Sequence, residues 1–128
     1  MSRKYKFVDN ESIYFVTFAL TNWIDLFIRD EYRNIIIDSI KYCQKEKDLE
    51  VYGWCLMTSH MHMIIGSKGN ELSNIIRDLK RHTSEKLHAA ILAHPHESRR
   101  EWMLWMMERA AATTSNSAKF QLWQLESL

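Results

Sequence analysis

The sequence predicts an α+β domain of the ferredoxin-like class, an antiparallel βαββαβ sheet with its helices packed on one face. Strand-like and helix-like runs follow one another in the order strand, helix, strand, strand, helix, and two of the strand-like runs are separated by only two residues. This order is the split βαβ arrangement, which requires one more strand near the end. Three glycines and one proline in 128 residues fit a closely packed chain, so we assign residues 1–128 to a single domain.

The first half of the chain contains the clearest element signals. Residues 13–20 are β-branched or aromatic on both alternating faces, which is typical of a central strand. From 31 to 47, apolar residues recur every three or four positions and predict an amphipathic helix. The apolar runs 49–57 and 60–66 follow, and the two residues between them leave room only for an antiparallel hairpin.

A second amphipathic helix is predicted after the hairpin. Asn70 suits its N-cap, and the periodic pattern runs to about His94, before a proline. Residues 97–112 predict an additional short helix, and 113–118 a polar loop. Residues 119–124 are the candidate for the last strand, which completes the predicted βαββαβ order.

Composition narrows the class of protein. No apolar run approaches the ~20 residues of a membrane span, and the first residues lack a signal-peptide core, so we expect a cytoplasmic protein without membrane contact. Cys43 and Cys55 are not closely spaced, which favours reduced thiols packed as small core residues. The net charge is only +1, but basic residues gather at the N-terminus and between residues 77 and 100.

The strongest chemical signal is a pair of histidines on the third predicted strand. A strand has a period of two, so His60 and His62 project from one face while Met61 and Met63 project from the other. Two imidazoles are therefore offered to one ion, although two structural polar residues would show the same spacing. A second triplet, 94–96, straddles a proline at a predicted helix end, and we assign it to a solvated loop.

Together these features resemble the HUH endonucleases, specifically the REP-associated tyrosine transposases and their insertion-sequence relatives. The resemblance runs from Arg3 to Gln124. Met57 is kept from the Met-Pro-Asn that usually precedes the histidine pair in that family, and Thr-Ser replaces the other two residues. Residues 77–84 are similar to the family's Lys-rich helix, and 120–124 to the strand before its catalytic segment.

The resemblance implies a metal-dependent enzyme that cuts and rejoins single-stranded or hairpin DNA through a phosphotyrosine intermediate. His60 and His62 would hold a divalent ion, Mg²⁺ or Mn²⁺, at the scissile phosphate. Imidazole ligands suit Mn²⁺ better, whereas Mg²⁺ is the cellular ion that the family implies. The residues expected to contact DNA phosphates lie at the basic N-terminus and on the second helix: Arg3, Lys4, Arg77, Lys80 and Arg81.

The nucleophile implied by the resemblance has no match in this sequence. In the family a tyrosine lies on a further helix, beyond the strand that 120–124 resembles, and a third metal ligand comes from that helix. All five tyrosines here precede the histidines. We therefore assign no catalytic residue and expect an inactive, C-terminally truncated chain. The apolar residues that the absent helix would leave exposed make a homodimer a further expectation.

Two other functions remain open on the sequence alone. A non-catalytic nucleic-acid-binding module is the main alternative, because ferredoxin-like sheets bind single strands through aromatic residues and basic flanks. It would need no metal, so a metal titration separates the two. A small-molecule or assembly domain is the third alternative, and it predicts no DNA binding even at low salt.

Overall fold

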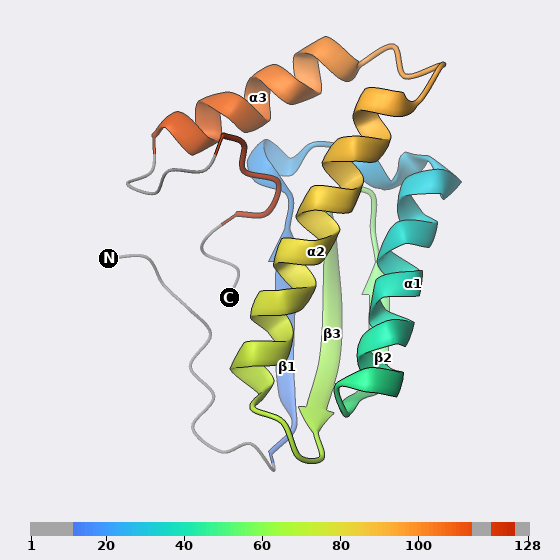
Figure 1. The fold of residues 1–128 in the computed structure, drawn as a ribbon, viewed down its shortest axis with the longest axis vertical. Coiled ribbons are helices and arrows are strands. Elements are labelled where there is room, and N and C mark those ends of the chain that lie inside the picture. The colour runs from blue at the N-terminus through green and yellow to red at the C-terminus, as the bar shows by residue number, and fades with distance from the viewer. Residues whose placement is uncertain (1–11, 114–118, 125–128) are drawn as a thin grey trace.

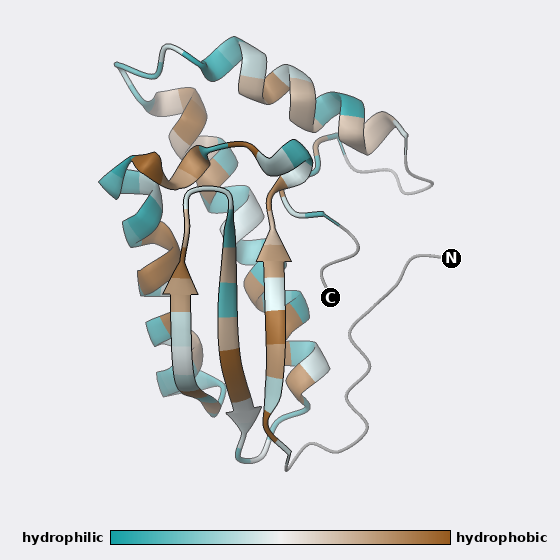
Figure 2. Ribbon diagram, turned by 180° about the vertical axis from the view of Figure 1, so that it is seen from behind, coloured by the Kyte–Doolittle hydropathy of each residue, from teal (hydrophilic) through white to brown (hydrophobic). Residues whose placement is uncertain are grey.

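The computed structural model describes residues 12–113 and 119–124. Its centre is a three-stranded antiparallel sheet with the strand order β1-β3-β2 (Figure 1). Strand β1 spans Tyr14–Ala19, β2 spans Leu49–Leu56 and β3 spans His60–Ser67. Helices α1 and α2 cover one face of this sheet, and Figure 2 shows the other face, which we call the open face, in front of both helices. The predicted α+β class and the placement of the helices on one face are confirmed.

Three helices and two short 3-10 turns complete the described fold. Helix α1 spans Asp30–Glu46, α2 spans Leu72–Ala93, and α3 spans Arg100–Ala112 across the end of the sheet. The turns η1 (Thr21–Trp23) and η2 (Leu26–Ile28) connect β1 to α1. Within the described ranges, none of the helices combines the length and the apolar character needed to cross a membrane.

The core lies between the sheet and the two long helices because apolar residues follow the period of each element. On β3, Met61, Met63 and Ile65 alternate toward the helices and are buried. The helix-facing side of β1 contributes Val16 and Phe18. The side of α2 predicted from its periodicity is buried against them: Leu72, Ile75, Ile76, Leu79, Thr83, Leu87 and Ile91.

The predicted last strand, residues 119–124, forms only one isolated bridge, between Leu20 and Trp123. Two backbone hydrogen bonds flank that bridge, from Thr21 N to Leu122 O and from Gln124 N to Ala19 O, both 2.8 Å. The ladder ends there because the chain turns away from the sheet directly after Leu20. The segment is also held by the side chain of Trp123, which is buried and donates from Nε1 to Thr83 Oγ1 (3.0 Å), and by Gln121 N, which donates to Met107 O (3.0 Å).

Two predicted helix starts also differ from the structure. Asn70 does not cap α2: Glu71 holds the N-cap position, and Asn70 Nδ2 donates to the Lys47 carbonyl at 3.0 Å instead. The third helix begins at Arg100 and not at 97, because Glu97 is drawn into a buried cluster of charged residues. Of the predicted polar loop 113–118, residues 114–118 lie outside the described residues.

Candidate functional site

His60 and His62 lie side by side on the open face of the central strand, as predicted. Their ring centroids are 4.8 Å apart. In the sheet register, His62 pairs with Thr17 of β1 and His60 pairs with Ala19. Both histidines are half-buried, whereas Met61 between them points to the helices and is fully buried. The alternation of side chains along β3 therefore holds both imidazoles on the face that α1 and α2 leave uncovered (Figure 2).

A neighbouring hydroxyl contacts the Nδ1 atom of each imidazole. Thr17 Oγ1 lies 2.9 Å from His62 Nδ1, and Ser59 Oγ lies 3.2 Å from His60 Nδ1. A contact of this kind fixes the ring orientation and directs Nε2 toward an incoming ligand. Two imidazoles oriented in this way fit a borderline divalent ion such as Mn²⁺. In the part of the chain that the structure describes, no cluster of three His, Cys, Asp or Glu residues completes a metal site.

Two exposed aromatic side chains flank the pair, one at each histidine. Phe15 stacks on His62 with the centroids 5.4 Å apart and the planes 20° apart. Trp23 meets His60 edge to face at 5.0 Å. Neither side chain is among the site residues predicted from the sequence. The face of Phe15 could have been predicted, because Phe15 lies two residues before Thr17 on the same strand. Trp23 lies in a turn whose path the sequence pattern does not reveal.

The backbone of that turn is strained. Asn22 has φ 53° and Trp23 has φ 54°, and Ile24 N donates to Thr21 O at 3.3 Å. Two successive positive φ angles in a four-residue turn define the type I′ geometry, which strongly favours Asn-Gly. Asparagine tolerates this conformation, but a residue as bulky as tryptophan pays about 1–2 kcal/mol for it.

Cys55 and His94 differ from their predicted environments, whereas Pro95 and His96 are exposed loop residues, as predicted. Cys55 is exposed on the open face, opposite His62, and is not a core thiol, because the register of the hairpin turns it away from the helices. His94 is not a solvated loop residue: its side chain is only 10% exposed and its Nε2 lies 3.4 Å from Glu31 Oε2. The rings of His94 and His96 are 6.4 Å apart, so they do not reproduce the arrangement on β3.

The predicted basic side of α2 divides into two environments. Arg77 and Arg81 are exposed and share the carboxylate of Asp78 at 3.4 and 3.3 Å, and Lys47 reaches the same carboxylate at 3.3 Å. Three cations around one carboxylate leave a local excess of positive charge. This patch lies on the helix side of the sheet, so it does not adjoin the histidine pair. Arg3 and Lys4 lie outside the described residues.

Lys80, in contrast, turns toward the sheet and the C-terminal segment. Its ammonium lies 3.5 Å from Gln124 O and 5.7 Å from the centroid of the Phe18 ring. Burial lowers the pKa of Lys80 to about 8. Because Lys80 lies beside Phe18 and Gln124, its aliphatic stem packs against the core. Its charge is less available to a phosphate than the charges of Arg77 and Arg81.

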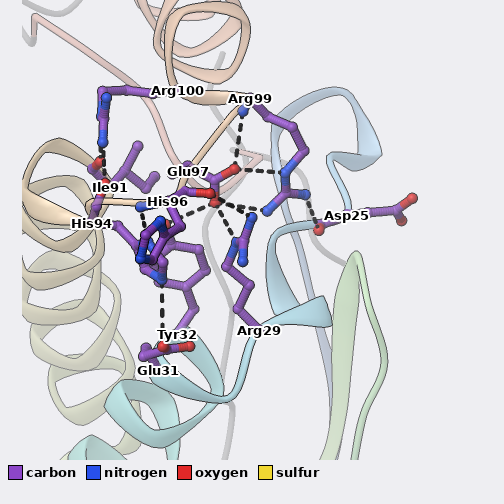
Figure 3. Close-up of polar contacts among 10 residues, drawn as sticks. All are labelled: Asp25, Arg29, Glu31, Tyr32, Ile91, His94, His96, Glu97, Arg99 and Arg100. Carbon is purple, nitrogen blue, oxygen red and sulfur yellow. Dashed lines mark hydrogen bonds and ion pairs between the residues drawn. The ribbon is translucent and has the colours of Figure 1, made fainter.

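The other ionic cluster surrounds Glu97, which the sequence analysis did not single out (Figure 3). Its side chain is fully buried, and its carboxylate accepts hydrogen bonds from Arg29 Nε, Arg99 Nε and Tyr32 Oη, each at 2.9 Å. Burial alone would raise the pKa of Glu97, but the hydrogen bonds from Arg99 and Arg29 outweigh it and hold the pKa well below its usual range. This ionised cluster joins the residues before α3 to the start of α1.

Two solved structures of transposases are similar to this chain. One is a REP-associated tyrosine transposase bound to a REP hairpin, with a TM-score of 0.60 and 17% sequence identity over all of this chain. This chain spans 60% of that protein's length. Another is a candidate transposase from Deinococcus radiodurans R1, with a TM-score of 0.52 and 17% identity, matched over 80% of this chain and 75% of the other.

Sequence comparison gives the family directly. No curated protein sequence matches the chain significantly. The family model described as "Transposase IS200 like" matches residues 13–124, which include the whole sheet, all three helices and both histidines of the open face. The chain therefore belongs to the IS200-like transposase family.

Proposed function

We propose that this chain binds single-stranded or hairpin DNA and holds a divalent ion at His60 and His62, as the metal and strand-binding part of a site for DNA cleavage and strand transfer, and that the chain itself does not cut DNA. The observation that carries the proposal is the pair itself: two imidazoles 4.8 Å apart, each with its Nδ1 atom against a hydroxyl. Family membership supports the reaction class, and the structural neighbour bound to a REP hairpin supports DNA as the partner.

The residues of the site have separate tasks in this proposal. The Nε2 atoms of His60 and His62 would hold the ion, and Thr17 and Ser59 keep the two rings in position. A divalent ion held there would stabilise the negative charge that develops on the scissile phosphate. Among residues 12–113 and 119–124, no helix lies over the pair, so these residues leave both imidazoles accessible to an extended strand of DNA.

Removing either imidazole is expected to abolish Mn²⁺ binding measured by isothermal titration calorimetry. His60→Ala and His62→Ala each delete one of the two ligands, so we expect affinity to fall at least ~100-fold, beyond the 10–100-fold typical of lost outer contacts. Thr17→Val removes only the hydroxyl that orients His62 and should reduce affinity about 10-fold. His96→Ala is the matched control, because His96 belongs to the other His-x-His triplet.

Equal Mn²⁺ affinity in the wild type, His60→Ala and His62→Ala would contradict the metal site. That outcome would favour a non-catalytic nucleic-acid-binding module of ferredoxin-like fold. A specific observation supports this second function: the open face presents exposed aromatic side chains, Phe15 and Tyr52, of the kind that stack on bases. DNA binding would then persist without any dependence on the ion.

DNA affinity is expected to fall steeply as salt rises, and the cluster of Arg77 and Arg81 should contribute to that slope. Each phosphate contact that is lost reduces the slope of log affinity against log salt by about 0.7 for a single strand. The double change Arg77→Ala with Arg81→Ala should therefore flatten the slope by about 1.4 in fluorescence anisotropy titrations. Lys41→Ala with Lys45→Ala, which removes two exposed charges from α1, is the control. An unchanged slope in the arginine variant would remove this patch from the DNA-binding surface.

A further inference from the structure

The turn that follows β1 presents a tryptophan where its backbone favours glycine. Trp23 occupies the second central position of the turn Thr21–Ile24 with φ 54°, a conformation that L side chains rarely adopt. Strain of this kind persists where the surrounding structure imposes it, and it gathers at functional sites. A strained tryptophan at this position therefore indicates a role for its indole ring.

Core packing does not explain why a tryptophan occupies position 23. Trp23 is 54% exposed, and its ring meets His60 edge to face at 5.0 Å. Trp123, only 6% exposed, shows how this protein buries a tryptophan: its indole nitrogen donates to Thr83 and its ring packs beside Phe18 and Phe27. Trp23 instead leaves half of its surface at the open face, beside the histidine pair.

Phe15 gives the other histidine a matching neighbour. It is 62% exposed on the open face and stacks on His62. Four rings thus form a row, Phe15, His62, His60 and Trp23, with centroid separations of 5.4, 4.8 and 5.0 Å. The two outer rings are apolar and exposed, and the two inner rings are imidazoles. The row therefore has nitrogen ligands at its centre and aromatic surface at both ends.

We propose that Phe15 and Trp23 are base-stacking positions that seat the unpaired nucleobases on either side of the phosphate held at His60 and His62. This inference rests on the proposed function and adds the side chains that position the single strand. Aromatic rings suit the task because every base has a π-face, so stacking binds a single strand without selecting its sequence. A paired duplex offers no free base faces, so these positions favour unpaired DNA.

The test uses the full chain and hairpin oligonucleotides whose unpaired flank contains 2-aminopurine at successive positions. Trp23→Gly removes the ring and also relieves the backbone strain, so the unfolding temperature should stay the same or rise. Phe15→Ala removes the other ring. Each variant should weaken DNA binding about 5- to 150-fold and abolish the stacking-induced fluorescence change at one flank position, a different position for each variant.

Trp102→Ala is the matched control, because Trp102 is 51% exposed on α3 and is not one of the four rings in the row. It should bind DNA like the wild type. The same loss of DNA affinity should appear when EDTA replaces Mn²⁺, which separates stacking from metal binding. Wild-type DNA affinity and fluorescence in Trp23→Gly and Phe15→Ala would overturn the stacking inference and leave the proposed function standing. Failure of the wild type to bind DNA at low salt would instead overturn the proposed function.

Discussion

Glu97→Gln is expected to lower the free energy of unfolding by about 2–4 kcal/mol, the loss that follows when one partner of a buried ion pair is removed. Glu97 is fully buried and forms ion pairs with both Arg29 and Arg99, whose side chains are 28% and 22% exposed. Because both arginines retain some access to water, we expect the loss of unfolding free energy to lie in the lower part of that range. In thermal unfolding the transition should fall by about 10 °C.

The same carboxylate makes the stability of the fold depend on pH. The pKa of Glu97 is lowered in the folded chain. Its contribution to the free energy of unfolding is therefore complete above the unfolded pKa of about 4.3, and it is lost as the pH falls below that value toward the folded pKa. The wild type should therefore lose stability below about pH 4.5, and Glu97→Gln should lose less over the same range. Glu85→Gln, on the exposed side of α2, is the control and should resemble the wild type. Equal unfolding temperatures in Glu97→Gln and the wild type at pH 7 would show that the cluster contributes no net stability.

Two further hydrogen bonds connect the Glu97 cluster to the histidine site. Arg99 Nη1 donates to the Asp25 carbonyl at 2.7 Å, and the Asp25 carboxylate accepts from Thr58 Oγ1 at 3.0 Å. Thr58 lies two residues before His60, in the turn of the β2–β3 hairpin. Asp25 belongs to the connection that also contains Trp23. Losing Glu97 should therefore loosen both the hairpin turn and the turn beside the histidines.

The parts of the fold that sequence could predict are those set by local periodicity. The face of His60 and His62 follows from the alternation with Met61 and Met63, and the hairpin follows from the two residues between its strands. Both depend on neighbours along the chain. The prediction of the buried side of α2 succeeded for the same reason.

The parts that sequence missed depend on distant contacts. Glu97 is buried because Arg29 and Tyr32, more than sixty positions earlier, meet it at the start of α1. An acidic residue after a proline gives no sign of such partners. Lys80 was grouped with Arg77 and Arg81 by helical spacing, but Phe18 and Gln124 draw it toward the sheet. Residues 119–124 are apolar enough for a strand, yet the left-handed turn after β1 leaves them only one bridge.

The chain of residues 1–128 is expected to form no covalent adduct with labelled single-stranded DNA in the presence of Mn²⁺. A tyrosine nucleophile must reach the phosphate that the proposal places at His60 and His62, and the described tyrosines lie elsewhere in the fold. Tyr14 faces the helices, Tyr32 is buried with its hydroxyl on Glu97, and Tyr42 lies on α1. Denaturing gel electrophoresis after incubation measures the adduct directly.

Tyr52 is the one tyrosine on the open face among residues 12–113 and 119–124, so it sets the sharpest control. Its ring lies over Gly66, four residues along β3 from His62 and so roughly 13 Å away. A hydrogen bond to Glu50 raises the pKa of its hydroxyl, which disfavours the phenolate. An adduct that disappears in Tyr52→Phe would make Tyr52 the nucleophile and contradict this geometry. An adduct that persists in Tyr52→Phe would point to Tyr5, outside the described residues.

If no adduct forms while Mn²⁺ and DNA still bind, the described residues provide the metal and strand-binding parts of the site, and the nucleophile must come from elsewhere.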